Sequence, residues 1–280
     1  MITLENVLFA YNRKKPLFNG LNIKLDQGNI YGLLGRNGAG KTTLLKLIAG
    51  LVFSRSGKCM LNGHDAKDRV PEALEDLYIL PEEFELPSVS IKMYADLNSP
   101  FYSKFDREKF NNLLEEFHLD PQKKLNHLSY GQKKKFLLAF GLSTNARHLL
   151  MDEPTNGLDI PSKSQFRKVI AASMATDQII IISTHQVRDL QSLIDPVIIM
   201  DNGEIIFNRT IEEISEKLSF ESFHTAVGGE KIIYSEEIFG GKSAVLANTS
   251  GRETRVDLEL LFNAAINQPQ AINEVFANPS

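Results

Sequence analysis

The residues from Gly35 to Thr42 read G-R-N-G-A-G-K-T, a pattern that binds phosphate. Glycines let the backbone adopt the positive φ angles with which successive N–H groups turn toward an anion. The ammonium of Lys41 would reach the β and γ phosphates of a nucleotide, and the hydroxyl of Thr42 would ligate Mg²⁺. A strand-like run precedes the loop and a helix-like run follows it, so the positive end of that helix would face the phosphates. We expect nucleotide contacts from these residues and their neighbour: Gly35, Asn37, Gly38, Ala39, Gly40, Lys41, Thr42 and Thr43.

Two acids, Asp152 and Glu153, directly follow a second apolar run. At the end of a strand, Asp152 could hold Mg²⁺, and Glu153 would project toward an attacking water. Two acids after a strand are common, and on their own they would indicate only a solvated strand end. The phosphate-binding loop makes the catalytic interpretation the better one.

A third segment reads Leu128-Ser129-Tyr130-Gly131-Gln132 and continues through three lysines into an apolar helix. Ser129 can cap that helix, which leaves the N-terminal amides available to an anion. The segment lies about ninety residues after the loop, so the sequence alone does not place the two together.

The order of apolar segments predicts an α/β fold with a mixed sheet. Short runs at 2–9 and 21–25 favour antiparallel strands that lead to the nucleotide-binding strand. The stretch at about 84–144 has helical spacing, and from 147 to 200 strand and helix patterns alternate, which indicates a parallel sheet. Asn202-Gly203 predicts a hairpin turn after the last parallel strand.

Residues 208–280 have the pattern of a small α+β accessory region that follows a first domain at 1–207. We expect helices at 211–218 and 257–266, and strands near 220–227, 231–234 and 243–247. Three roles stay open for this region: regulation, an extended dimer contact, or packing over the sheet edge.

The charge, the apolar runs and the cysteine content of the chain limit which partners and which cellular compartment we expect. The net charge of −4 predicts no bulk attraction to nucleic acid, and we expect no nucleic-acid partner. Apolar runs fall well short of the roughly 20 residues of a spanning helix, and the N-terminus lacks a secretory pattern. The single Cys59 forms no internal disulfide, which suits a reducing cytoplasm.

The motifs occur in one order: phosphate loop, L-S-x-G-Q segment, Asp152-Glu153 and Ser183-Thr184-His185. This order resembles the ATP-binding subunit of ABC transporters, over about residues 2–207. The resemblance implies a P-loop NTPase of the ABC ATPase type with a helical subdomain at about 84–144. It also implies ATP and Mg²⁺ as cofactors, with Tyr11 on the adenine and His185 on the γ phosphate. Tyr11 as a packing residue and His185 as a structural one are the alternatives.

In that family two subunits close head to tail around two ATP molecules. The resemblance therefore assigns Ser129, Gly131 and Gln132 to the ATP of a partner, either an identical copy or a paralogous ATPase subunit. Asp159 would bridge the two subunits, unless it is an ordinary loop acid. The catalytic residues would be Glu153, His185 and Lys41. An integral membrane permease would be the further partner, which places the chain in the cytoplasm on the inner face of the membrane.

Two positions depart from the family pattern. Glu82, in Leu80-Pro81-Glu82, stands where a glutamine is usual, and as a carboxylate it could ligate the metal with Thr42 and Asp152. This Leu-Pro-Glu form is similar to that of bacterial exporters, so export is expected. Tyr130 stands where glycine is commoner, and its side chain is expected to point away from the nucleotide. Two other classes remain: an ABC-type ATPase without a permease, and a nucleotide-gated module without turnover.

Overall fold

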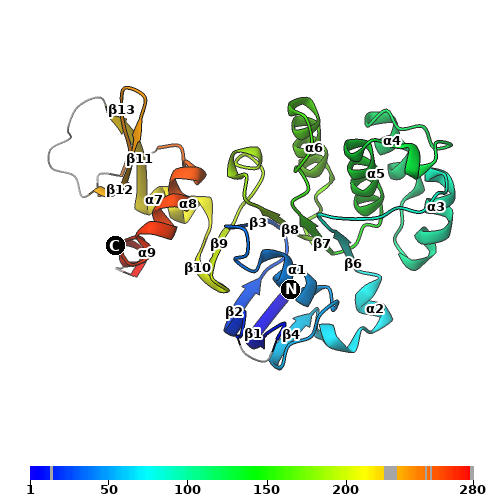
Figure 1. Ribbon diagram of the computed structural model, residues 1–280, viewed down its shortest axis with the longest axis horizontal. Helices are drawn as coiled ribbons and strands as arrows, with labels where there is room; N and C mark the ends of the chain where they lie inside the picture. Colours follow the sequence, from blue (N-terminus) through cyan, green and yellow to red (C-terminus); the bar gives the residue numbers. More distant parts are fainter. Residues whose placement is uncertain (13–14, 224–231, 250, 253, 278–280) are drawn as a thin grey trace.

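The computed structural model describes residues 1–12, 15–223, 232–249, 251–252 and 254–277. A six-stranded sheet in the order β10-β9-β3-β8-β7-β6 forms its centre (Figure 1). Its parallel strands are β3 (Asn29–Gly35), β6 (Leu77–Leu80), β7 (His148–Asp152), β8 (Ile179–Thr184) and β9 (Val197–Asp201). The strand β10 (Glu204–Arg209) pairs antiparallel with β9 through the predicted Asn202-Gly203 turn.

The N-terminal strands are antiparallel, as predicted, and form a sheet separate from the mixed central sheet that contains β3. This antiparallel sheet has the order β2-β1-β4-β5. Its strands are β1 (Ile2–Phe9), β2 (Phe18–Leu25), β4 (Ser56–Leu61) and β5 (His64–Asp65). The helix α1 (Lys41–Ile48) shares one apolar core with both sheets, including Leu4, Leu45 and Leu33. A buried helix between the sheets is the physical reason that they remain separate.

Successive side chains of the central strands point to opposite faces of the sheet, and so the core has two layers. Leu33 and Ile181 face the layer that contains α1, whereas Leu34 and Ile182 face the opposite layer. The opposite layer is covered by the helical subdomain and α6 (Ile160–Ser173). The helices of the subdomain are α3 (Ile91–Asn98), α4 (Arg107–Glu116) and α5 (Tyr130–Ser143), with the short helix η2 (Ser99–Phe101). The short helix α2 (Pro71–Leu74) precedes β6.

The predicted accessory region begins with α7 (Ile211–Lys217) and a three-stranded sheet in the order β11-β13-β12. The strands are β11 (Leu218–Phe223), β12 (Ile232–Ile238) and β13 (Gly241–Ala247), and the part of the predicted strands at 224–231 lies outside the described residues. The helices α8 (Leu258–Asn267) and α9 (Pro269–Ala277) follow. Leu258 and Leu261 belong to the same buried cluster as Val197 and Ile199, so this region packs against the central sheet.

Within the described ranges, every helix is too short or too polar to cross a bilayer.

Candidate active site

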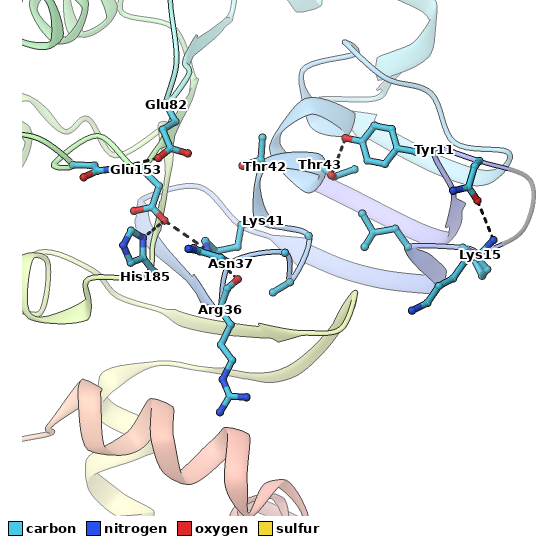
Figure 2. Close-up of a pocket in the computed structure, with 17 residues that line it drawn as sticks. Tyr11, Lys15, Arg36, Asn37, Lys41, Thr42, Thr43, Glu82, Glu153 and His185 are labelled. Atoms are coloured by element: carbon cyan, nitrogen blue, oxygen red, sulfur yellow. Dashed lines mark hydrogen bonds and ion pairs between the residues drawn. The ribbon is translucent and has the colours of Figure 1, made fainter. Parts of the chain in front are cut away.

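A cleft of about 760 Å³ opens between the loop from β3 to α1 and the ends of β6, β7 and β8 (Figure 2). The glycine-rich loop forms its floor, and Tyr11 lies at one side with Glu82, Glu153 and His185 at the other. The residues that line it are Tyr11, Asn12, Lys15, Pro16, Leu17, Arg36, Asn37, Gly38, Ala39, Gly40, Lys41, Thr42, Thr43, Glu82, Glu153, Asn156 and His185. The structure therefore brings the predicted phosphate, base and γ-phosphate residues to one cleft.

The loop has the backbone conformation that the glycines were predicted to allow. Gly38 and Gly40 have φ angles of +83° and +112°, which favour glycine. A Cβ at Gly40 would lie 2.8 Å from the Phe18 ring, so a larger residue does not fit there. The first turn of α1 has no side-chain cap, which leaves its amide groups directed toward the cleft for an anion.

Lys41 is buried at the start of α1, and its ammonium is held close to the loop. Its Nζ donates to the Gly35 carbonyl at 2.8 Å and to the Arg36 carbonyl at 3.4 Å. The same nitrogen lies 3.6 Å from Glu153 Oε1. A cation in this place can neutralise phosphate charge, as the motif predicts.

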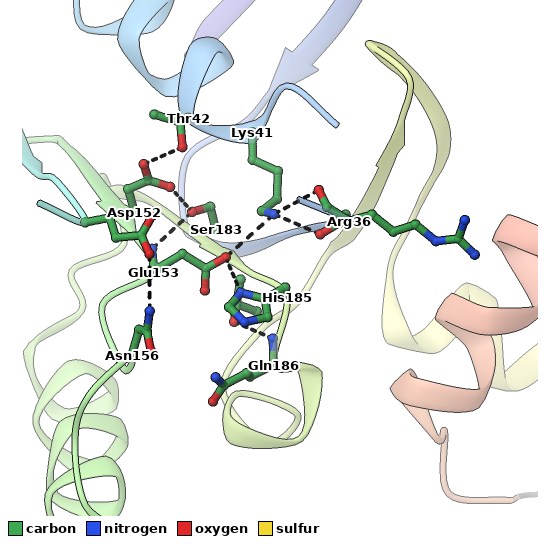
Figure 3. A network of polar contacts seen from close by, with 12 residues as sticks. Arg36, Lys41, Thr42, Asp152, Glu153, Asn156, Ser183, His185 and Gln186 are labelled. Carbon is green, nitrogen blue, oxygen red and sulfur yellow. Dashed lines mark hydrogen bonds and ion pairs between the residues drawn. The ribbon is translucent and has the colours of Figure 1, made fainter. Parts of the chain in front are cut away.

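Asp152 and Thr42 lie together where β7 ends and α1 begins, although these two elements are far apart in sequence (Figure 3). Thr42 Oγ1 donates to Asp152 Oδ2 at 2.6 Å, and the Ser183 hydroxyl donates to Asp152 Oδ1. Hydroxyl and carboxylate oxygens are the hard ligands that Mg²⁺ prefers, so this donor set fits that ion. Asp152 itself is 3% exposed and is not among the residues that line the cleft.

Glu153 lines the cleft between His185 and Lys41. Its Oε1 lies 2.8 Å from His185 Nδ1, and its backbone has a φ of +44°. A left-handed conformation costs a residue with a side chain on the order of 1–3 kcal/mol, so surrounding contacts must hold the turn in place. The Glu153 amide donates to the Ser183 carbonyl at 3.1 Å, which fixes one side of the residue.

Tyr11 reaches the cleft from the segment after β1. Its hydroxyl lies 3.0 Å from Thr43 Oγ1, and its ring contacts Phe9 edge to face. Tyr11 is 65% exposed as a residue, which leaves room for a base to stack on its ring. Adenine stacking by Tyr11 stays a prediction.

The residues predicted to serve a partner's ATP lie elsewhere. Ser129 is the N-cap of α5 and forms a capping box with Gln132, and Gly131 lies in the first turn. These residues do not line the cleft described above. Asp159 caps α6 by accepting from the Ser162 amide at 2.9 Å, and hydrogen bonding from the Ser162 side chain, followed by that from its amide, lowers the pKa of the Asp159 carboxyl. The dimer assignment of these residues stays a prediction.

Sequence reasoning missed several residues of the site. Ser183 orients Asp152, and the Asn156 amide group donates to Glu82 Oε1 at 3.2 Å. Lys134 is 2% exposed and bonds the turn at Glu153, and burial lowers its pKa to about 8. One signal was available: Lys134 stands three and four residues before the buried Leu137 and Leu138 and so shares their helix face.

A glycine-rich loop between a strand and a helix, with Thr42 hydrogen-bonded to Asp152 at the start of that helix, defines a P-loop nucleotide-binding protein. Residues 18–156 match the protein family described as ABC transporter. The linearmycin resistance ATP-binding protein LnrL of Bacillus subtilis (strain 168) is 29% identical over 243 residues, which cover 83% of this chain and 74% of that protein.

Two solved structures share the fold. One is described as the ATP-binding subunit of an ABC transporter, with a TM-score of 0.70 and 23% identity over 76% of this chain and 91% of that one. The other, described as a dimeric post-hydrolysis state of the ATP-binding cassette MJ0796 with ADP and Pi, has a TM-score of 0.65 and 19% identity over 75% and 98%. The chain therefore has the ABC ATPase fold, and its residues 18–156 match the ATPase domain of ABC transporters.

Proposed function

We propose that this chain is the ATP-hydrolysing subunit of a bacterial ABC exporter, and that it works as a head-to-tail dimer on a separate membrane permease. The observation that carries the proposal is the arrangement around Glu153. Its carboxylate lies 2.8 Å from His185 Nδ1 and 3.6 Å from Lys41 Nζ, at the end of the cleft where the loop would hold a γ phosphate.

The chemistry is in-line attack of water on the γ phosphorus, which breaks the bond to the oxygen that bridges the β and γ phosphates and releases ADP. Glu153 accepts a proton from the attacking water as general base, and His185 contacts the γ phosphate. Lys41 stabilises the charge on the phosphate oxygens. Mg²⁺, held by Thr42 and Asp152 with Glu82 as a third candidate ligand, would add positive charge to these oxygens.

The dimer follows from the separation of two phosphate-binding features in one chain. The loop lies in the cleft, whereas the amide end of α5 lies outside it with Ser129 exposed. An ATP held between the loop of one subunit and Ser129, Gly131 and Gln132 of another would use both. Asp159 would bridge the two subunits. The structure described as a dimeric cassette supports this arrangement, and the second subunit is an identical copy or a paralogue.

The permease contact belongs to the helical subdomain. Most aromatic residues at 84–105 pack on the core, but Met93, Leu97 and Phe101 are 51%, 57% and 73% exposed. Their spacing of four residues places Met93 and Leu97 on one face of α3, and Phe101 follows in η2. An apolar surface of this kind suits a helix of a permease on the inner face of the membrane. The relative named for linearmycin resistance supports export.

The substitution Glu153→Gln tests the hydrolysis. It keeps the shape of the side chain but removes the proton acceptor, so we expect the turnover number to fall at least about 100-fold. Binding of ATP, measured with a fluorescent analogue, should stay within about threefold, and ATP-bound dimers should accumulate in size-exclusion chromatography.

Glu82→Gln is the matched control, because it changes another carboxylate of the same cleft wall. It should retain turnover within about tenfold, since the glutamine can still ligate a metal or water. Turnover by Glu153→Gln at the unsubstituted rate would remove Glu153 from its assigned role.

A further inference from the structure

Lys134 is a buried cation whose partners belong to the active-site turn. Its Nζ donates to the Glu153 carbonyl at 2.7 Å and to the Asn156 carbonyl at 2.9 Å. The side chain is 2% exposed, on the face of α5 that packs into the core. Removing a lysine from water is unfavourable unless its ammonium is hydrogen-bonded, and here backbone oxygens supply those bonds.

The hydrogen bond from Lys134 is one of several that fix the backbone of Glu153. The amide of Glu153 is fixed by the Ser183 carbonyl, and its own carbonyl accepts from both Lys134 Nζ and the Asn156 amide. The residue has a left-handed φ of +44°, so the turn needs such bonds to persist. The peptide groups on both sides of Glu153 then set the direction of its carboxylate toward His185 and Lys41.

Tyr130, one helical turn before Lys134, contacts the loop that carries Glu82. Its hydroxyl donates to the Glu82 carbonyl at 3.0 Å, and its ring stacks on Phe84 with centroids 5.5 Å apart. Lys134 Nζ lies 5.2 Å from the centre of the Tyr130 ring. The two departures from the family pattern, Tyr130 and Glu82, are therefore direct neighbours.

We propose that Lys134, assisted by Tyr130, is a positioning residue that fastens the first turns of α5 to the turn that carries Glu153. This inference rests on the proposed function, in which Ser129 at the start of α5 contacts the ATP of a partner. A partner's nucleotide that orders the start of α5 would then also order Glu153 in the other cleft. Lys134 acts on hydrolysis through Glu153 and touches no nucleotide itself.

Three substitutions at one position separate hydrogen bonding from packing. Lys134→Met keeps the apolar stem and removes the donors, whereas Lys134→Gln and Lys134→Arg keep a donor. We expect Lys134→Met to lower kcat about tenfold or more with KM and the Kd of a fluorescent ATP analogue within about threefold. Lys134→Gln or Lys134→Arg should recover a substantial part of kcat. Lys133→Met, on the neighbouring and partly exposed position, is the control and should leave kcat unchanged.

Tyr130→Phe removes one hydroxyl and keeps the ring, so it provides a second test that does not depend on the folding of Lys134→Met. It should lower kcat severalfold, and its effect should be less than additive with Lys134→Gln because the two side chains hold one network. A kcat within twofold of the unsubstituted protein in every variant at both positions would overturn the proposal. So would a loss of kcat that follows only the melting temperature, without recovery by any donor.

The outcomes also separate this proposal from the proposed function. Absence of turnover in the unsubstituted protein would refute both. Normal turnover that depends on Glu153 but not on Lys134 or Tyr130 would refute the positioning role alone.

Discussion

At the scale of single residues, Lys134 and His148 show that burial of a titratable group has two different meanings. Lys134 is buried with its ammonium bonded to the active-site turn, so its burial serves a specific contact. His148 begins β7 and is 1% exposed, with Nδ1 3.2 Å from the Asp76 carbonyl and Nε2 without a hydrogen-bond partner among the described residues. Because this buried imidazole resists protonation, we expect His148 to make the stability of the fold depend on pH.

Burial lowers the pKa of His148 to about 4, with the N-terminal ammonium of Met1 as a smaller cause. The folded state thus binds this proton less readily than the unfolded chain, whose histidine titrates near pH 6.5. Stability from this group is present above the unfolded pKa and is lost as pH falls toward the folded pKa. Between pH 7 and pH 5 we expect the free energy of unfolding to fall by about 2 kcal/mol through His148.

Urea unfolding at the two pH values measures this effect. In His148→Phe the difference between pH 7 and pH 5 should shrink by about that amount, whatever the variant's stability at pH 7. His127→Gln changes an exposed histidine and should leave the difference unchanged. An equal pH difference in the protein with and without His148 would contradict the assignment.

At the scale of elements, the start of α6 joins a structural role with a proposed functional one. Asp159 caps the helix through the Ser162 amide, and the resemblance to ABC transporters also assigns it to the contact between subunits. Asp159→Ser keeps a capping oxygen without the charge, and Asp159→Ala removes both. We expect only the alanine variant to lower the melting temperature.

If Asp159 bridges the subunits, both variants should lower ATP turnover severalfold, because the carboxylate is lost in each. Steady-state hydrolysis and thermal unfolding on the same samples give the two readouts. Full turnover by Asp159→Ser would reduce Asp159 to a helix cap.

Elements with strong local patterns were predictable from the sequence, and their partners were not. The apolar runs of β7 and β8, and the Asn202-Gly203 hairpin, lie where the sequence placed them. The membership of β1 and β2 in their own sheet depends on α1 packing between the layers, which no local pattern encodes. The helix α9 was missed, although Pro269 is a typical first residue of a helix.

The same division applies to the site. The phosphate loop and its lysine were predictable because their residues are adjacent in sequence. Lys134 and Tyr130 were not assigned their partners, since these lie 19 and 48 residues away on other elements. Their contacts arise only when α5, β7 and the Glu82 loop pack together.

At the scale of the whole molecule, one apolar cluster extends from the helical subdomain across the central sheet to the C-terminal helices. Phe136, Ile182 and Leu261 all belong to it. In Figure 1 the helical subdomain and the C-terminal region lie on opposite sides of the central sheet. Residues after 208 therefore share the core of the first domain, and regulation and dimer contact stay open as further roles.

The proposed dimer makes a prediction that only two whole subunits can satisfy. The chain has a single cysteine, Cys59, which is buried, and burial raises the pKa of its thiol to about 12. Cysteines introduced as Asn37→Cys and Ser129→Cys would therefore be the reactive thiols.

In a Glu153→Gln background, ATP should bring Asn37→Cys of one subunit close to Ser129→Cys of the other and permit a disulfide. We expect a cross-linked dimer in non-reducing electrophoresis with ATP and Mg²⁺, and little with ADP, because the γ phosphate is the group that both subunits contact. The variants that carry only one of the two introduced cysteines are the controls and should form no cross-linked dimer, since a head-to-tail dimer separates identical positions. Cross-linking that is equal in ATP and ADP, or absent in both, would contradict the shared ATP site.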